Sequence, residues 1–321
     1  MSDLDAMLEA AGISDGPQSS VDPETFRSGF VTLIGRPNAG KSTLLNHIMG
    51  EKLAITSRTA QTTRHRFRAV YDTDDMQMIM VDTPGIHKPK DALGEELNES
   101  ALQGLSDVDV AALLIDASQP VGKGDEWVAK HVNEASCNKI LVISKSDLVK
   151  KGVALERAQE ASALCDFDET VILSAKHNRN LDTFIEAVYT LLPLGPRWFP
   201  RGTGLDMSDE VLIAEFIREK ILRSTFDEVP HAVGVVVEDI ERDEKRRFMR
   251  IWAVIYVERN SQKGIIIGKG GSKIKQVGSE ARVDLERLFD CKIHLDLNVK
   301  VKKDWRNDAS QIRKFGYGEG L

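Results

Sequence analysis

Short apolar runs alternate with stretches of helical spacing along the first two thirds of the chain. Runs that are short and continuously apolar are typical of strands buried on both faces, and helices between them imply a mostly parallel sheet covered on both sides. Ligands of such sheets bind beyond the carboxyl ends of the strands. The pattern therefore predicts an α/β domain. Its expected strands are Phe30–Ile34, Met78–Val81, Val110–Ile115, Ile140–Ile143 and Val171–Leu173.

A different order of elements follows a segment rich in turn-forming residues. Leu192–Asp206 contains three prolines and three glycines, which predicts a linker, placed here at residues 194–207. Beyond it, helix, two strands, helices and strand follow one another, which predicts a smaller α+β domain at residues 208–321. Its expected elements are the helices Glu210–Ser224 and Val277–Phe289 and the strands Ala232–Val237, Phe248–Val257 and Ile293–Val301.

The beginning of the chain is polar and acidic. Residues 1–28 hold one arginine against six Asp and Glu, so we expect a disordered extension before an α/β domain at residues 29–193. Ser2 could instead cap a short docking helix that places Leu4, Met7, Leu8 and Ala11 on one side.

Composition narrows the class of protein. A chain of 321 residues that is 41% hydrophobic suits two soluble domains, and no run reaches the roughly 18 apolar residues that span a bilayer. No secretory-signal pattern opens the chain, and Cys137, Cys165 and Cys291 lie too far apart for a metal-ligand spacing. A reducing cytosol is the simplest expectation. The net charge of −7 does not suggest a nucleic-acid binder, but residues 261–303 hold ten Lys and Arg against five Asp and Glu.

The first motif lies directly after the first expected strand. Gly35–Ser42 reads GRPNAGKS and fits the phosphate-loop pattern G-x-x-x-x-G-K-[ST] between a strand and a helix. Its glycines let the backbone fold around phosphates, and the helix N-terminus adds positive potential. We expect Lys41 to neutralise the β- and γ-phosphates and Ser42 to bind Mg²⁺. The predicted phosphate-binding residues are Gly35, Arg36, Pro37, Asn38, Ala39, Gly40, Lys41, Ser42 and Thr43.

A second element, Asp82-Thr83-Pro84-Gly85, follows the expected strand Met78–Val81. Asp82 is placed to hold Mg²⁺ through water, and Gly85 can offer its N–H to the γ-phosphate. All four residues are predicted to contact the nucleotide.

The segment Gln61–Arg64 lies between the first helix and the next strand. A threonine hydroxyl there would complete the Mg²⁺ coordination when a γ-phosphate is present. We assign Thr63, with Thr62 as the alternative, although a solvated threonine pair explains the residues equally well. The predicted metal ligands are Ser42, Thr63 and Asp82, and the predicted catalytic residues are Lys41, Thr63 and Gly85.

The base site is expected after two further strands. Asp147 in Ser144-Lys145-Ser146-Asp147 can accept hydrogen bonds from the guanine N1–H and amino group, a donor pair that adenine lacks. Lys145 would lie along the base plane. Ser174-Ala175-Lys176 can offer backbone N–H groups to guanine O6. Ser144 stands where the usual motif has asparagine, which removes support worth about 1 kcal/mol and predicts slightly looser binding with guanine specificity kept.

Hydrolysis is expected to be slow. Many GTPases carry a glutamine after the DxxG motif to orient the attacking water, and here the position holds Ile86. No arginine finger can be assigned, so a partner or a cation would accelerate the reaction. Asn38 could help bind potassium, although a turn-forming role accounts for it at least as well.

The second domain carries a GxxG loop at Gly268–Gly271, expected between a strand and a helix. Two glycines let the backbone approach a sugar-phosphate chain, and modules of this kind clamp about four single-stranded nucleotides. A solvated basic turn is the plainer alternative. The predicted RNA-binding residues are Ile267, Gly268, Lys269, Gly270, Gly271, Lys273, Ile274 and Lys275.

The succession GRPNAGKS, QTTR, DTPG, SKSD, SAK and GKGG resembles the bacterial Era GTPases, which join a TrmE-Era-EngA-type GTPase domain to a C-terminal type II KH domain. The match runs from about Phe30 to the C-terminus. It implies GTP, GDP and Mg²⁺ as ligands, the 3′ end of 16S ribosomal RNA as partner, and a role in maturation of the small ribosomal subunit. It also implies a monomeric cytoplasmic protein with peripheral inner-membrane contact and no DNA partner. Ser144 and the acidic extension depart from the family pattern.

An alternative function is a signalling GTPase whose second domain binds protein or the membrane surface. The basic surroundings of the GxxG loop argue against a protein-binding domain. No strong amphipathic anchor is recognisable, so any membrane contact would be peripheral.

Overall fold

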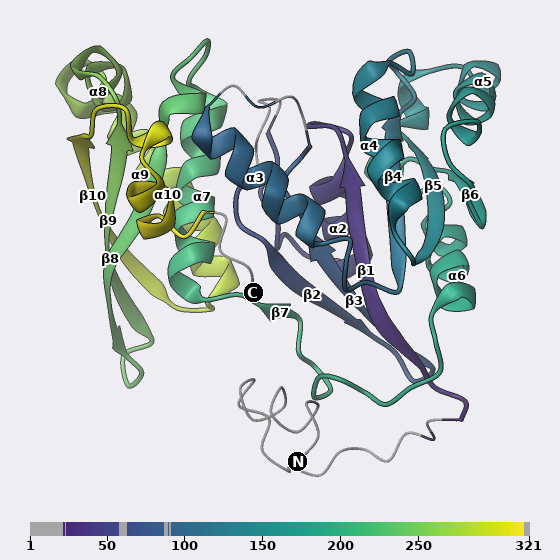
Figure 1. Ribbon diagram of the computed structural model, residues 1–321. Helices are drawn as coiled ribbons and strands as arrows, with labels where there is room; N and C mark the ends of the chain where they lie inside the picture. The colour runs from purple at the N-terminus through teal and green to yellow at the C-terminus, as the bar shows by residue number, and fades with distance from the viewer. Residues whose placement is uncertain (1–21, 23, 58–62, 87–88, 90, 318–321) are drawn as a thin grey trace.

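The computed structural model describes residue 22 and residues 24–57, 63–86, 89 and 91–317 (Figure 1). Most of the expected acidic extension, including the alternative helix after Ser2, lies outside these residues. Its last residues do not: strand β1 begins at Arg27, and Phe26 is buried beneath the guanidinium of Arg197. The folded domain therefore starts earlier than predicted, because an aromatic anchor precedes the strand.

The first domain is built on a seven-stranded sheet in the order β6-β5-β4-β1-β3-β2-β7. Its parallel part confirms the expected α/β class, and β2 pairs antiparallel with β3. Strand β2 was not predicted, because Arg68 and Asp72 interrupt its apolar residues. The strands are β1 (Arg27–Gly35), β2 (Phe67–Asp72), β3 (Met76–Asp82), β4 (Val110–Asp116), β5 (Asn138–Ser144), β6 (Glu169–Ile172) and β7 (Leu205–Asp206).

Helices cover both faces of this sheet, as Figure 1 shows. One face packs against α2 (Lys41–Met49) and α6 (Leu181–Leu191), and the other against α3 (Ala92–Gln103), α4 (Lys123–Glu134) and α5 (Lys151–Ser162). This burial on both sides explains the continuous apolar runs. Among the residues described, no helix is long and apolar enough to cross a membrane.

The segment predicted as a linker is fastened to the first domain. Strand β7 adds to the sheet edge through β2, and Val70 N donates to Gly204 O at 3.0 Å. The side-chain oxygen of Gln77 accepts from the backbone N–H groups of Trp198 and Phe199, each at 2.8 Å. The prolines and glycines correctly indicated a change of domain here, but the segment is bonded to the first domain and does not hang free between the two.

The second domain has a three-stranded sheet in the order β10-β9-β8, with helices on one face. The central strand β9 pairs antiparallel with β8 and parallel with β10. This sheet and its helices confirm the expected smaller α+β domain. Its main elements are α7 (Asp209–Ser224), β8 (Gly234–Asp243), β9 (Phe248–Val257), α8 (Asn260–Ile267), α9 (Ser272–Leu288), β10 (Lys292–Val301) and α10 (Ala309–Lys314).

The GxxG loop joins α8 to α9, so its expected position after a strand is wrong. Ile266 and Ile267 belong to the last turn of α8, and only Ile266 is fully buried. An apolar run this short does not distinguish a strand from one turn of helix.

The two domains share an apolar cluster. Leu93 and Leu97 of α3 pack with Trp305, Phe315 and Tyr317 near the C-terminus. The chain end thus joins a helix of the first domain to the sheet of the second.

Candidate functional site

The phosphate loop connects β1 to α2 at the carboxyl end of the sheet. Gly40 has a φ of 102°, a left-handed conformation that favours glycine. Lys41 folds back over the loop, and its Nζ donates to Gly35 O at 3.2 Å and to Arg36 O at 3.3 Å. Burial lowers the pKa of Lys41 to about 8. The amine is therefore held inside the loop that the sequence assigned to phosphates.

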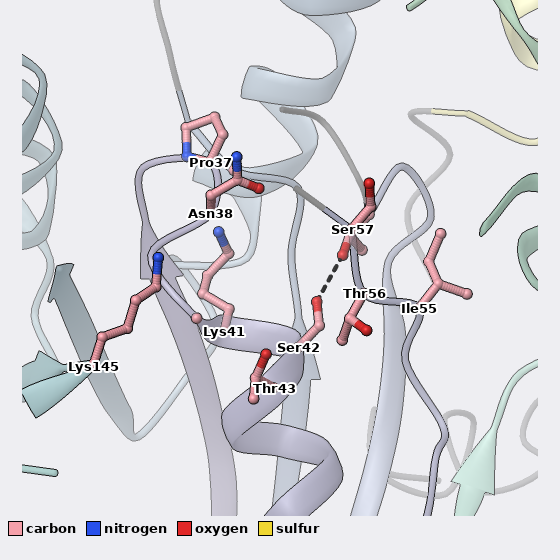
Figure 2. Close-up of a pocket in the computed structure, with 12 residues that line it drawn as sticks. Pro37, Asn38, Lys41, Ser42, Thr43, Ile55, Thr56, Ser57 and Lys145 are labelled. Atoms are coloured by element: carbon pink, nitrogen blue, oxygen red, sulfur yellow. Dashed lines mark hydrogen bonds between the residues drawn. The ribbon is translucent and has the colours of Figure 1, made fainter. Parts of the chain in front are cut away.

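A cavity of about 300 Å³ opens beside this loop. Figure 2 shows Pro37, Asn38 and Lys41 on one side of it, and Ile55, Thr56 and Ser57 on the other. Ser42 and Thr43 line it at the start of α2, with Gly40, Thr63, Gly85 and Lys145 completing the wall. Residues 55–57 were not predicted to line the nucleotide cavity, because they belong to no recognisable motif.

The three predicted metal ligands come together from three separate segments. Ser42 Oγ and Thr63 Oγ1 lie 3.0 Å apart, a contact that Figure 2 marks with a dashed line. Both hydroxyls also donate to Asp82 Oδ2, at 3.1 and 3.3 Å. Asp82 is fully buried, which raises its pKa to about 6 despite the nearby charge of Lys41.

This group of oxygens fits Mg²⁺. Asp82 Oδ1 is buried with no hydrogen-bond partner among the described residues. Oxygen donors suit a hard cation that keeps several waters and also binds substrate phosphates. Ser42, Thr63 and Asp82 would hold the ion, directly or through water. When bound, it would neutralise charge between the β- and γ-phosphates. The alternative Thr62, like Gln61, lies outside the described residues.

The DxxG segment lies tightly against the phosphate loop. A Cβ atom at Gly85 would lie 2.7 Å from Pro37 Cα, so glycine is required by close approach. Ile86 is fully buried in the core and cannot orient a water molecule. The hydroxyl of Thr83 donates to Leu33 O at 3.0 Å inside the sheet, which turns it away from the cavity. Pro84 is absent from the cavity wall described above.

Arg36 also faces away from the cavity. Its NH1 lies 3.0 Å from Asp125 Oδ2, and both side chains line a second hollow of about 220 Å³ behind the loop. Any contact of Arg36 with a nucleotide would therefore come from its backbone. Ala39 lines the second hollow.

Ser144 fastens the end of β5 to the phosphate loop. Its Oγ donates to Ala39 O at 2.6 Å, with Ile115 O 3.1 Å away. Serine in place of the usual asparagine was expected to remove a supporting hydrogen bond at this position. The short hydroxyl nevertheless reaches the loop, because the two backbones lie close together: a Cβ at Gly40 would be 3.8 Å from that of Ser144.

The predicted base-binding residues meet beyond β5 and β6. Ser174 Oγ donates to Asp147 Oδ1 at 2.5 Å, and this hydrogen bond keeps the pKa of Asp147 below its ordinary value. Lys145 Nζ forms an ion pair with Asp116 Oδ2 at 2.7 Å, a partner that the sequence analysis did not identify. Ala175 and Lys176 start the adjoining short helix. An ionised carboxylate that accepts hydrogen bonds is what guanine recognition needs.

The second domain carries a groove of about 340 Å³ between α9 and the edge strand β10. Of the predicted RNA-binding residues, Ile274 and Lys275 line it, whereas Ile267 does not. Lys269 and Gly270 are exposed at the loop. Lys273 is directed elsewhere, because its Nζ donates to Ser224 O at 2.9 Å. The groove residues missed from sequence are Gly278, Ser279, Arg282, His294, Leu295 and Leu297.

Comparisons with known proteins cover both domains. Residues 30–145 match the model of the 50S ribosome-binding GTPase family, and residues 228–306 match the KH domain. The chain is similar to Era crystallised with MgGDPNP and nucleotides 1506–1542 of 16S ribosomal RNA, at 35% identity and a TM-score of 0.88, over 91% of this chain and 99% of that one. It is equally similar, with the same identity, TM-score and coverage, to a variant of Aquifex aeolicus Era bound to GDP·AlF4⁻.

A shared fold alone would not identify an activity. Here the likeness extends through both domains, because it covers 91% of this chain at 35% identity and both domain models match. The chain belongs to the Era family of GTPases.

Proposed function

We propose that this GTPase is a nucleotide-controlled RNA-binding switch that binds the 3′ end of 16S ribosomal RNA and acts in assembly of the small ribosomal subunit. GTP and Mg²⁺ would occupy the first domain, and RNA the groove of the second. One observation carries the switch: the two ends of the segment that runs from Thr56 to His65 are held by a single helix of the second domain, α7.

The first end is held by Glu219 of α7. Thr56 N donates to Glu219 Oε1 at 3.0 Å, and Lys52 Nζ lies 2.5 Å from Oε2. Burial would raise the pKa of Glu219, but the hydrogen bond from Lys52 and its other partners lower it. Thr56 belongs to the cavity wall, so a bound nucleotide and Glu219 act on the same short segment.

The second end is held one helical turn away. His65 Nδ1 lies 2.8 Å from Glu215 Oε1, and the neighbouring Arg64 donates to the backbone oxygens of Val233 at 2.7 Å and His231 at 3.0 Å. Burial would raise the pKa of Glu215, but Arg218 and His65 outweigh it and lower the pKa to about 2. Residues four apart on a helix share a face, so Glu215 and Glu219 point at the same segment.

The same ionic group extends to helix α9. Lys52 Nζ lies 2.8 Å from Asp284 Oδ2 on α9, and Lys220 joins Glu219 to that carboxylate. Helix α9 supplies one wall of the groove. A change at Thr56 or Thr63 on GTP binding would therefore be transmitted to the groove, and RNA would in turn change nucleotide affinity or turnover.

The test is RNA-binding anisotropy with a short RNA that copies the 3′ end of 16S ribosomal RNA and a scrambled sequence. The chain would carry a GTP analogue or GDP. Lys269→Asp/Gly270→Asp reverses charge at the loop, and Lys151→Asp/Gly152→Asp makes the same change on the distant helix α5. We expect nucleotide-dependent preference for the genuine sequence, lost only in the first variant. Equal weak binding of both RNAs in every state would leave a GTPase whose second domain has another partner.

A further inference from the structure

The strands β9 and β10 carry aromatic and basic side chains on the sheet face opposite the helices. Met249, Ile251 and Ile293 point into the core, so Phe248, Arg250 and Trp252 of β9, with Lys292 and His294 of β10, lie on the other face. Phe248 is 38% exposed. We call these five residues the open sheet face.

We propose that the open sheet face is a second contact surface for single-stranded RNA, taking nucleotides that extend beyond the groove. The inference rests on the proposed RNA-binding function. A GxxG module clamps about four nucleotides, so a longer single strand must cross further protein surface or leave it.

The open sheet face is continuous with the groove. His294 lines the groove at the end opposite the GxxG loop, beside Arg282 of α9. Because side chains alternate along a strand, His294 also belongs to the open sheet face, where its ladder partner is Arg250. Strand β10 is the edge of the sheet, so a strand of RNA that leaves the groove meets this face without crossing another element.

The chemistry of the open sheet face suits unpaired bases. The guanidinium of Arg250 lies 4.7 Å from the centre of the Trp252 ring. Bases stack on aromatic rings and on arginine planes alike, whatever their sequence. Lys292 is the ladder partner of Phe248, and its side chain is exposed. Its ammonium could therefore contact a phosphate next to a base stacked on the exposed ring of Phe248.

Acidic residues limit where the RNA can run. Asp296 pairs with Arg250 at 3.3 Å and holds it in place. Asp239, Glu241 and Asp243 of β8 lie opposite Trp252, Arg250 and Phe248 and would repel phosphates. The contact surface is therefore confined to β9 and β10. At its far end, Phe315 stacks on Tyr256 with ring centres 4.9 Å apart and covers the sheet.

The experiment compares two RNA lengths on the full chain loaded with a GTP analogue. One RNA has about four nucleotides, enough for the groove, and the other carries about six more on the side that leaves the groove at His294. Phe248→Ala/Arg250→Ala removes exposed side chains and leaves the core unchanged. Lys300→Ala is the control: it removes one charge from the same face of β10, near the far end of the strand.

We expect the double variant to bind the long RNA about tenfold more weakly and the short RNA as the wild type does, because loss of a stacked base costs that much. Lys300→Ala should change neither affinity. Equal losses for both lengths, or no loss for the long RNA, would overturn the proposal. Unchanged RNA affinity with weaker binding to small ribosomal subunits would assign the face to a protein partner. Failure of the GxxG variant to affect either RNA would instead refute the proposed function.

Discussion

The nucleotide cavity and the RNA groove hold their ligand groups in opposite ways. Lys41 and Asp82 are buried, with 6% and 0% of their surfaces exposed, and each is fixed by backbone or side-chain hydrogen bonds. Lys269, Lys275 and Arg282 of the second domain are exposed, and no hydrogen bond holds their side chains among the residues described. A buried site can tell one base or phosphate from another, because an unpaired group inside it is costly. An open basic groove attracts any sugar-phosphate chain and depends on salt.

Lys41→Ala removes the buried amine of the nucleotide cavity. Truncating one member of a buried, hydrogen-bonded charge pair costs several kcal/mol, so GTP affinity should fall about 1,000-fold. Titration with a fluorescent GTP analogue measures it, and Lys123→Ala, an exposed lysine of α4, is the control. A loss of less than about tenfold would show that the buried amine does not meet the phosphates.

Glu219→Gln would weaken the ion pairs through which helix α7 links the nucleotide cavity to the RNA groove. The neutral amide leaves Lys52 and Lys220 short of a buried partner, which should lower the free energy of unfolding by about 3 kcal/mol. The ratio of RNA affinities in the GTP-analogue and GDP forms should shrink by about tenfold. Thermal unfolding and anisotropy measure the two effects.

The control for this variant is Glu160→Gln, which breaks the exposed pair with Arg157 on α5 and should cost less than about 1 kcal/mol. If the affinity ratio survived in Glu219→Gln while stability fell, the carboxylate would be a structural anchor without a part in the switch.

Ser144→Ala tests the tether between the base site and the phosphate loop. Loss of the hydrogen bond to Ala39 O is worth about 1 kcal/mol, so GTP should bind about fivefold more weakly. Guanine should still be preferred over adenine, because Asp147 is untouched. Competition between GTP and ATP measures both, with Ser162→Ala on α5 as the control. A change in base preference would mean that Ser144 also positions Asp147.

The smallest expected effect concerns the monovalent cation. Asn38 lies at the cavity with a φ of 65°. That conformation suits a turn, while its side chain is placed beside Lys41 (Figure 2). We predict that GTP hydrolysis is faster in potassium than in sodium, and that Asn38→Ala abolishes the difference. Equal rates in the two salts for the wild-type chain would remove the cation from the mechanism.

Most of the nucleotide site was predictable because its chemistry is concentrated in short contiguous motifs. A phosphate loop works through consecutive backbone N–H groups, so its residues must be neighbours in sequence. The buried strands were predictable for a similar reason, since a sheet covered on both faces needs continuous apolar runs. Strands β2 and β7 were not predicted. The two residues of β7 form a strand because they pair with β2.

The two domains, the guanine-nucleotide chemistry and the basic GxxG loop follow from the sequence alone. Which side chains share a surface depends on how the elements pack. In the fold Arg36 pairs with Asp125, and Lys273 donates to Ser224 O. Residues 55–57 line the nucleotide cavity, while Glu219 and Glu215 contact Thr56 and His65. The paired residues are 49 to 163 positions apart in the sequence, so these contacts leave no local periodicity. The packing of helices against loops determines these contacts, and no short sequence motif indicates how those elements pack.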